Sequence, residues 1–470
     1  MADLNHNIFS GLERKVFDSK NDSTYRSKAL IGLSEELIYK ISKDKNEPEW
    51  MLQHRLKSLR QFFDMPLPEW GPDISVIDFD EICFYARASE VTHSENWEEV
   101  PEEIKNTFER LGIPAAEQKM LAGAGAQYES ESVYHSLKEK WEKLGVVFLD
   151  LDQAIHSHED LVKEYFMKCV PFRDHKFAAL HGAVWSGGTF LYIPKGVKVS
   201  EPLQSYFRMN APGMGQFEHT LIILEEESEA HYIEGCSAPK YGKTSLHAGC
   251  VEIYVKPRAS MRYSSVENWS KDTYNLNTKR AIVEKNAHME WVGGNMGSGV
   301  TMLYPCSVLK GENASASHLG IAFANEGQNQ DTGAKILHLA SHTSSKVLSK
   351  SISKAGGIST YRGIVKVSPL ACNCMVNVEC DALLLDEISE THTIPFMDIA
   401  NNSAVIAHEA SVDRLSEEDL YYLMSKGLSE EQARAMVVNG FIQPIVKELP
   451  LEYAIEMNRL IEMEMEGSVG

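Results

Sequence analysis

The spacing of apolar residues divides this chain of 470 residues into three parts. Residues 1–172 carry apolar residues mainly at helical spacing, and helical spacing returns in residues 411–470. Residues 173–410 consist instead of short β-branched and aromatic runs separated by Gly, Asn, Ser and Lys turns. The pattern predicts a mainly β core between helical N- and C-terminal domains, with these three ranges as the domains.

Prolines and glycines indicate where helices begin and end in the N-terminal part. A helix with apolar residues from Leu52 to Phe63 is expected to begin near Pro48. Two further apolar stripes, in residues 104–111 and 137–144, are each followed by a glycine that is expected to end a helix.

Capping residues predict the helices of the C-terminal part. Ser416 is expected to cap a helix that ends near Gly427, and the capping-box sequence of residues 429–432 to begin one that ends near Gly440. Residues 449–467 predict a last helix. The apolar residues of these helices fit internal packing and a docking face for another protein equally well.

The β-rich part repeats itself at an interval of about 28 residues. Its markers are four alanines at nearly even spacing, namely Ala230, Ala259, Ala287 and Ala314. Such an interval is typical of a solenoid whose stacked coils bury a common core. Residues one interval apart then lie on neighbouring coils, about 4.8 Å apart. The repeat therefore favours a parallel β-helix over a β-sandwich.

Cys380 and His408 are one such interval apart, so the repeat places them on neighbouring coils, with Glu409 next to the histidine. A thiolate, an imidazole and a carboxylate are a suitable ligand set for iron or zinc. The alternative is that Cys380 is an ordinary core cysteine. Cys372 and Cys374 are expected to point to one face of a strand, and a passive role is favoured over roles as ligands or sulfur relays.

The same interval separates Arg208 from Cys236. A guanidinium on the neighbouring coil would lower the pKa of the thiol and favour the nucleophilic thiolate. Trp269 and Lys285 follow on later coils. The spacing fits equally well a core cysteine with an unrelated surface arginine.

The chain is acidic, with 67 Asp and Glu against 46 Lys and Arg and a formal net charge of −21. Nucleic acid and anionic membranes both require a basic surface, so we expect neither as a partner. The sequence has no apolar signal region near its start and no run of about 18 apolar residues, so we expect neither export nor a membrane span. The 8 cysteines are then expected to be reduced thiols in the cytoplasm.

Several familiar motifs are missing from the sequence. It contains no CxxC pair, which argues against a zinc ribbon and a thioredoxin-type redox pair. Residues 242–244 resemble the end of a P-loop, but Gly235 is at the wrong spacing to begin one. GxSxG and HExxH do not occur either. We therefore expect neither ATP hydrolysis nor familiar hydrolase chemistry from this chain alone.

Long blocks in a fixed order carry a family resemblance that covers nearly the whole chain. They read EPEWMLQHRLKSL, GAQYESESVYH, KFAALHGAVWSGGTFLYIPKGVKV, PLQSYFRMN, YIEGCSAP, ECDALLLD and AHEASVDRLSEEDLYYL. In these blocks the chain resembles the SufB family, the scaffold subunit of the Suf machinery for iron–sulfur cluster assembly.

The resemblance implies a right-handed parallel β-helix between helical domains. It implies that the C-terminal helices dock a SufC-type ABC ATPase, and that the β-helix pairs with a SufD-like paralogue or a second copy of this chain. Sulfur would arrive as persulfide from a cysteine desulfurase and its carrier. The scaffold, which is not itself an enzyme, would build a transient 4Fe–4S or 2Fe–2S cluster and pass it to apo-proteins. Reduced FAD is implied for some complexes of the family.

Site residues follow from the same resemblance. Cys380 matches the family's cluster-site cysteine, and His408 with Glu409 match its HEAS motif. Cys236 matches the proposed sulfur-accepting cysteine. Positions thought to line the sulfur route correspond to Arg208, Asn210, Glu267, Trp269 and Lys285.

The chain departs from the family pattern at two of these places. Glu267 stands where glutamine is common, and Ala407 stands where some members have a glutamate before the histidine. The ligand set of this chain can therefore differ from theirs.

The hypothesis is that Cys236 accepts sulfane sulfur with the help of Arg208 and Lys285, and that the sulfur moves through the β-helix to iron held at Cys380. ATP binding by the partner would move the C-terminal helices and open the subunit interface. One alternative is a β-helix polysaccharide lyase or glycosidase, which needs a carboxylate pair in a cleft. The other is a metal-free assembly platform whose cysteines are core residues.

Overall fold

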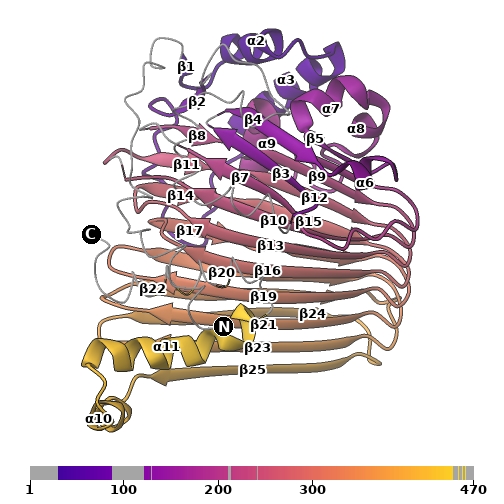
Figure 1. The fold of residues 1–470 in the computed structure, drawn as a ribbon. Helices are drawn as coiled ribbons and strands as arrows, with labels where there is room; N and C mark the ends of the chain where they lie inside the picture. The colour runs from indigo at the N-terminus through magenta and orange to yellow at the C-terminus, as the bar shows by residue number, and fades with distance from the viewer. Residues whose placement is uncertain are drawn as a thin grey trace.

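The predicted fold class is confirmed by the computed structural model: the chain is mainly β, with a parallel β-solenoid of about 8 turns and helices near the two ends of the chain (Figure 1). The structure describes residues 30–86, 121–128, 130–209, 213–240, 242–447, and the single residues 454, 458 and 461.

One sheet of 10 strands runs along the whole solenoid. In spatial order it contains β25 (Val405–Arg414), β23 (Met375–Leu384), β21 (Ser344–Ser353), β19 (Ser315–Ala324), β16 (His288–Met296), β13 (Ser260–Asn268), β10 (Glu229–Ser237), β7 (Leu203–Arg208), β3 (Gly123–Tyr128) and β4 (Glu131–Leu137). All neighbours are parallel except β3 and β4.

The second sheet folds back at β20 and so forms the other walls of the solenoid. Its strands are, in order, β5 (Val147–Asp150), β6 (Gly188–Ile193), β9 (His219–Leu224), β12 (Cys250–Val255), β15 (Thr278–Val283), β18 (Cys306–Leu309), β20 (Asn329–His338), β17 (Val300–Leu303), β14 (Thr273–Asn275), β11 (Ser245–His247) and β8 (Gly215–Gln216), with β22 (Ile358–Val367) and β24 (Glu390–Ile399) stacked beyond β20. Strand β20 pairs with β17 through its first residues and with β18 through its last, so coils from β20 onward have two long strands where earlier coils have three.

A left-handed residue two positions before a strand recurs from coil to coil. The residues with positive φ at this place are Glu227, Arg258, Asn286, Asn313, His342 and Asn373. Asn tolerates this backbone conformation better than most residues. The N–H of Asn286, for example, donates to the Glu312 carbonyl oxygen on the next coil at 2.9 Å. The polar turns that marked the repeat therefore also join one coil to the next.

The register of the strands matches the repeat except at its first step. Ser260, His288 and Ser315 are aligned, so the alanines that precede them occupy equivalent places. Ala230 is aligned with Met261 rather than with Ala259, so the first coil is longer than the alanines indicated.

Inward-facing residues of both sheets form the largest apolar cluster of the described residues. It contains, among others, Ile222, Val251, Ile253, Ala281 and Val283. At the outer face of the second sheet, residues such as Leu221 and Ile223 pack instead against the N-terminal layer. The central coils are therefore buried on two faces.

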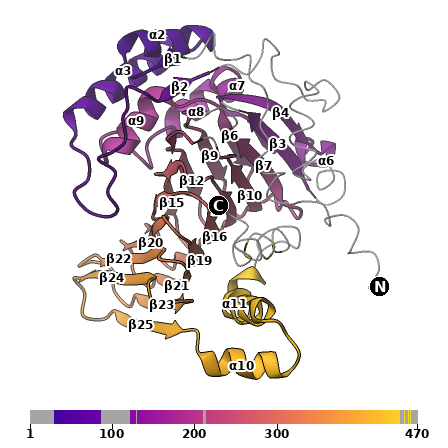
Figure 2. The same ribbon diagram turned by 90° about the vertical axis from the view of Figure 1, so that its left-hand side faces the viewer.

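The N-terminal layer covers one end of the solenoid (Figure 2). Its helices are α2 (Glu35–Asp44), α3 (Glu49–Asp64), α6 (Glu139–Glu142), α7 (Leu151–Ser157), α8 (Glu159–Tyr165) and α9 (Lys176–Val184), and a small sheet pairs β1 (Leu30–Ile31) with β2 (Cys83–Tyr85). The predicted first helix is α3, and Gly145, with φ of +81°, follows α6. The stripe of residues 104–111 lies outside the described residues.

Strands of the N-terminal part also join the solenoid, because β3, β4 and β5 extend its two sheets. The helical spacing expected over residues 137–144 yields only the short helix α6. The division of the chain at residues 172 and 410 stays a prediction.

The C-terminal helices begin at the predicted caps. Ser416 and Ser429 cap α10 (Glu417–Ser425) and α11 (Glu430–Val446), the second with a complete capping box. The predicted end near Gly440 is wrong, because α11 continues through Pro444 to Val446. Buried Ile442 and Ile445 pack against the first sheet, and this packing outweighs the helix-breaking tendency of glycine and proline.

Within the described residues, none of the helices combines the length and the apolar content that a bilayer span needs. Of the last predicted helix, only residues 454, 458 and 461 are described, and they are helical.

Candidate functional site

The last two strands of the first sheet bring Cys380 and His408 together. The Sγ atom of Cys380 lies 3.8 Å from Nε2 of His408. Cys380 is on β23 and is buried among inward-facing residues of the solenoid, while His408 is on β25, the last strand, and is half-buried. The pair therefore lies where the interior of the solenoid reaches its last coil.

The contact between the two side chains is diagonal. In the register of β23 and β25, Cys380 is aligned with Ala410, and His408 with Val378. The coil is thus slightly longer here than the interval read from the sequence, because the partner of Cys380 is the second residue after His408. Side chains two positions apart point to the same face of a strand, so the contact forms despite the shift.

Glu409 lies on the opposite face of β25 from His408, because neighbouring residues of a strand alternate in direction. It is aligned with Glu379 on β23. In this chain, therefore, a thiol and an imidazole share the interior face, and the carboxylate of Glu409 points the other way.

Cys380 is protonated in the absence of a metal. Burial raises the pKa of its thiol to about 12, with a further contribution from the charges of Asp381 and Glu379, while a hydrogen bond with Tyr361 opposes the shift. A bound metal ion would replace this proton, because thiols bind metals as thiolates.

Cys372 and Cys374 lie in the turn before β23, not on a strand as the sequence indicated. Asn373 between them has φ of +55°. Cys372 is exposed, whereas Cys374 is buried in the apolar core and lies 3.2 Å from Oγ1 of Thr343. Their environments therefore differ, and Cys372 provides a natural control for experiments on Cys380.

Cys236 lies earlier in the same sheet, on β10, and is covered from solvent. It is aligned with Phe207 on one side and Glu267 on the other. Its apolar neighbours include Cys83, Met214 and Trp269, and its side chain is 1% exposed.

The chemistry of Cys236 differs from the sequence prediction. Its pKa is raised well above the ordinary value by burial and by the carboxylates of Glu234, Glu218 and Glu267, and Lys279 opposes this shift. Arg208 is aligned with Ser237, to whose Oγ its guanidinium donates at 2.8 Å. The predicted lowering of the thiol pKa by Arg208 is therefore wrong for this conformation.

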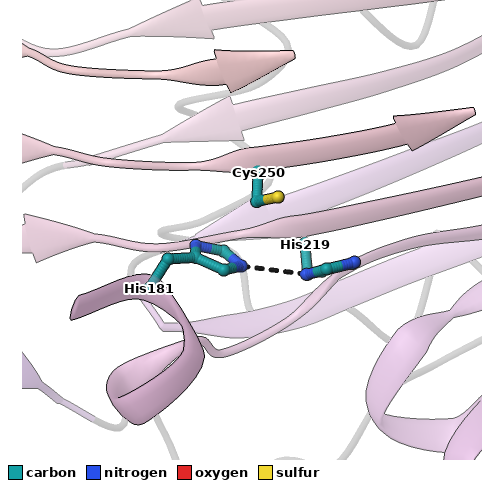
Figure 3. Close-up of side chains that lie close together, drawn as sticks. All are labelled: His181, His219 and Cys250. Carbon is teal, nitrogen blue, oxygen red and sulfur yellow. Dashed lines mark hydrogen bonds between the residues drawn. The ribbon is translucent and has the colours of Figure 1, made fainter. Parts of the chain in front are cut away.

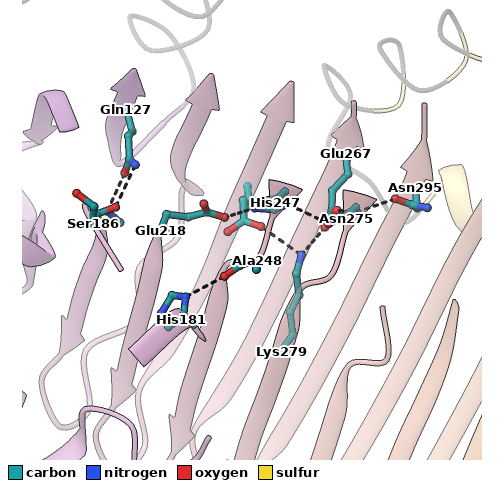
Figure 4. A network of polar contacts seen from close by, with 12 residues as sticks. Gln127, His181, Ser186, Glu218, His247, Ala248, Glu267, Asn275, Lys279 and Asn295 are labelled. Carbon is teal, nitrogen blue, oxygen red and sulfur yellow. Dashed lines mark hydrogen bonds and ion pairs between the residues drawn. The ribbon is translucent and has the colours of Figure 1, made fainter. Parts of the chain in front are cut away.

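A chain of buried polar side chains crosses the interior (Figure 4), and its carboxylates Glu218 and Glu267 are close enough to raise the pKa of Cys236. Nε2 of His247 lies 2.5 Å from Glu218 Oε1, and its Nδ1 lies 2.9 Å from Asn275 Oδ1. The Asn275 amide donates to Glu267 at 2.5 Å, and Lys279 Nζ donates to Glu267 at 2.8 Å. Lys279 also pairs with Glu234 at 3.2 Å. We call these side chains the interior network.

The hydrogen bonds of the interior network indicate that His247 is an imidazolium. Asn275 uses its NH2 group for Glu267, so its oxygen faces Nδ1 of His247 and both ring nitrogens donate. Burial alone would lower the pKa of His247, but Glu218 outweighs burial and raises it. The ring of Trp269 packs on that of His247, with centroids 4.3 Å apart.

The lysine of the interior is Lys279, not Lys285. Lys285 lies on an outer turn, is more than half exposed, and pairs with Glu312 at 3.0 Å. The assignment of Lys285 to the interior is therefore corrected. The alternation of Lys279 with Ala281 and Val283 on β15 was the signal for an inward-facing lysine that the sequence prediction missed. Asn210 lies outside the described residues.

Comparison with known proteins identifies the family. The profile of the family described as "SUF system FeS cluster assembly, SufBD core domain" matches residues 207–441, and that of the "SufBD protein N-terminal region" matches residues 125–205. The chain is 55% identical over 454 residues to the iron–sulfur cluster assembly protein SufB of Bacillus subtilis, with 97% of each chain covered. The chain belongs to the SufBD family. Among other SufBD relatives are iron–sulfur cluster assembly SufBD family proteins of Staphylococcus saprophyticus and Staphylococcus aureus, each 54% identical over 454 residues, with 97% of both chains covered.

This SufBD chain is thus a scaffold of the Suf system. The group that this family assembles is an iron–sulfur cluster. The thiol and imidazole of Cys380 and His408, 3.8 Å apart, are of the ligand types that iron accepts in such clusters.

Proposed function

We propose that this chain builds a nascent iron–sulfur cluster at Cys380 and His408. The observation that carries the proposal is the contact of these two side chains at the last coil of the solenoid, where neither is paired with an ion of opposite charge in the described contacts. Iron would bind the Cys380 thiolate and an imidazole nitrogen of His408. Cluster type, 4Fe–4S or 2Fe–2S, and the binding of reduced flavin remain predictions of the family resemblance.

The second β-helix is proposed to cover the last coil. At the C-terminal end of the solenoid, β24 and β25 are the last strands of the two sheets, and both are largely exposed. Their exposed apolar residues include Phe396, Val405 and Val412. Unpaired outer strands with apolar residues favour strand addition by another chain. A SufD-like paralogue or a second copy would then bring its own groups to the face that carries Glu409.

The ATPase partner is proposed to bind α10 and α11. Their residues Tyr421, Tyr422, Met424 and Met436 are exposed, while the opposite face packs on the solenoid. Exposed aromatic and methionine side chains are typical of protein interfaces.

Sulfur is proposed to enter at Cys236. Attack of its thiolate on the donor persulfide would break the donor's S–S bond, form a new one at Cys236, and release the donor cysteine as thiolate. Because Cys236 is buried and protonated here, the donor must meet a conformation in which the cover formed by Cys83 and Met214 is displaced. The interior network then provides charged groups between Cys236 and the later coils.

The test of the cluster site uses the chain co-expressed with its ATPase partner and reconstituted without oxygen. We expect wild type and the exposed-cysteine control Cys372→Ala to bind iron and acid-labile sulfide, and Cys380→Ala to lose both. Equal iron and sulfide in Cys380→Ala would place the site elsewhere.

A bypass experiment separates sulfur entry from the cluster site. We expect Cys236→Ser to fail with a cysteine desulfurase as the only sulfur source and to recover when inorganic sulfide is supplied. Cys380→Ala should fail with both sources. If Cys236→Ser is unimpaired with the desulfurase, sulfur does not enter at Cys236.

A further inference from the structure

A second cluster of metal-ligand side chains lies outside the solenoid interior (Figure 3). Nitrogen atoms of His181 and His219 and the sulfur of Cys250 all lie within 4.8 Å of one another. His181 is on α9, and His219 and Cys250 are the first residues of β9 and β12, aligned with each other in the sheet. All three side chains are at most 1% exposed.

The cluster lies between the second sheet and the N-terminal layer. Val251 and Ile253 of β12 face the solenoid core, so Cys250 and Glu252 face the outer side that α9 covers. The cluster is therefore separated by the sheet from the interior network and from the route proposed for sulfur.

The outer nitrogens of both imidazoles are already engaged. Nδ1 of His181 lies 2.9 Å from the Ala248 carbonyl oxygen, which can only accept, so this nitrogen carries a proton. Nε2 of His219 lies 3.1 Å from Oε2 of Glu252. Glu252 also accepts hydrogen bonds from the backbone N–H of Met167 at 2.5 Å and of Val170 at 2.7 Å. These contacts hold the carboxyl group of Glu252 beside the His219 ring.

The inner nitrogens of the two rings face each other. Nε2 of His181 and Nδ1 of His219 are 2.9 Å apart. Together with the sulfur of Cys250 they form a buried group of three ligand atoms, all within 4.8 Å of one another.

We infer that His181, His219 and Cys250 bind a divalent metal ion of the zinc class. Imidazole nitrogen and thiolate sulfur are both zinc ligands, and three of them leave one position of a tetrahedral ion for a further ligand. Contacts of the second ring nitrogens with a carbonyl and a carboxylate are those that usually orient metal-bound histidines. Zinc–nitrogen distances of about 2.0–2.1 Å would require the two rings to separate by only a few tenths of an ångström. The ion would join helix α9 to two successive coils.

Metal content tests this site in the full chain. All proteins carry Cys380→Ala, so that the proposed cluster site does not contribute, and are expressed in zinc-supplemented medium and dialysed against EDTA. We expect about one zinc per chain that resists EDTA because the ligands are buried. Cys250→Ser should lose this zinc. The matched control is Cys306→Ser, which changes an equally buried cysteine at the start of β18 in the same sheet.

Zinc-edge X-ray absorption of the Cys380→Ala protein gives an answer that does not depend on whether Cys250→Ser folds. We expect one sulfur at about 2.3 Å and nitrogens at about 2.0–2.1 Å. A zinc content near zero, a spectrum without sulfur, or equal zinc in Cys250→Ser would overturn the metal site and leave only the hydrogen bond between the two histidines.

Discussion

At the scale of single residues, burial decides the chemistry of the cysteines more than the nearest charge does. Cys236 and Cys380 both have raised pKa values, and in both burial is the main cause. Each thiol therefore stays protonated in this conformation. It becomes a metal ligand or a nucleophile only when a metal ion binds or when the structure opens. This is the opposite of an activated, exposed thiolate.

In the native chain, alkylation is expected to be faster at an exposed cysteine than at a buried one. At pH 8 the exposed Cys372 should react with iodoacetamide much faster than Cys236, since the raised pKa of Cys236 leaves less thiolate and its side chain is covered. Peptide mapping by mass spectrometry gives the two rates. Reaction of Cys236 at the rate of Cys372 would show that the buried conformation is not the one in solution.

Lys279 and Lys285 provide a matched pair of lysines. Lys279→Met leaves the buried carboxylates of Glu267 and Glu234 without their cation, so we expect a loss of roughly 3–5 kcal/mol in the free energy of unfolding. Lys285→Met removes only an exposed pair with Glu312 and should change it by less than about 0.5 kcal/mol. Denaturant unfolding measures both values, and equal losses would contradict the placement of Lys279 in the interior.

At the scale of elements, the exact length of each coil could not be predicted from the sequence. A diverged repeat indicates the mean interval, whereas turns add residues locally, as between Cys380 and Ala410. The contact of Cys380 with His408 could be predicted because an error of two positions keeps both side chains on one face. The prediction that Glu409 lies beside them did not take into account that neighbouring side chains of β25 point to opposite faces.

Local sequence signals predict where helices α10 and α11 begin, whereas tertiary packing decides where α11 ends. Their starts at Ser416 and Ser429 follow from local hydrogen bonds and were predictable. The end of α11 depends on packing of Ile442 against the solenoid, and no local signal reports that contact. The buried face of these helices packs on the solenoid, whereas docking of a partner on the exposed face stays a prediction.

Substitutions on the two faces of these helices should separate stability from binding. Ile442→Ala removes a fully buried side chain and is expected to cost about 2–5 kcal/mol of stability. Met436→Ala and Tyr421→Ala change exposed residues and should leave the unfolding midpoint nearly unchanged while weakening ATPase binding, measured by calorimetry, about tenfold or more. Unchanged ATPase affinity in both exposed-face variants would exclude this face as the docking site.

At the scale of the whole molecule, the solenoid separates three chemical environments along one chain. The N-terminal layer closes one end (Figure 2), and the inferred metal site lies between this layer and the second sheet. The interior holds the charged network beside Cys236, and the last two coils carry Cys380 and His408 next to exposed strands. Helices α10 and α11 lie near the last coil. A partner that moves these helices could therefore act on the coil that would hold the cluster.

The most direct test of the cluster site is pulsed electron paramagnetic resonance of the reduced, reconstituted complex with its ATPase partner, labelled with 15N-histidine. We predict a hyperfine coupling from an imidazole nitrogen in wild type that disappears in His408→Ala. The same coupling in His408→Ala, or a cluster in wild type without any nitrogen coupling, would contradict ligation of the cluster by His408 beside Cys380.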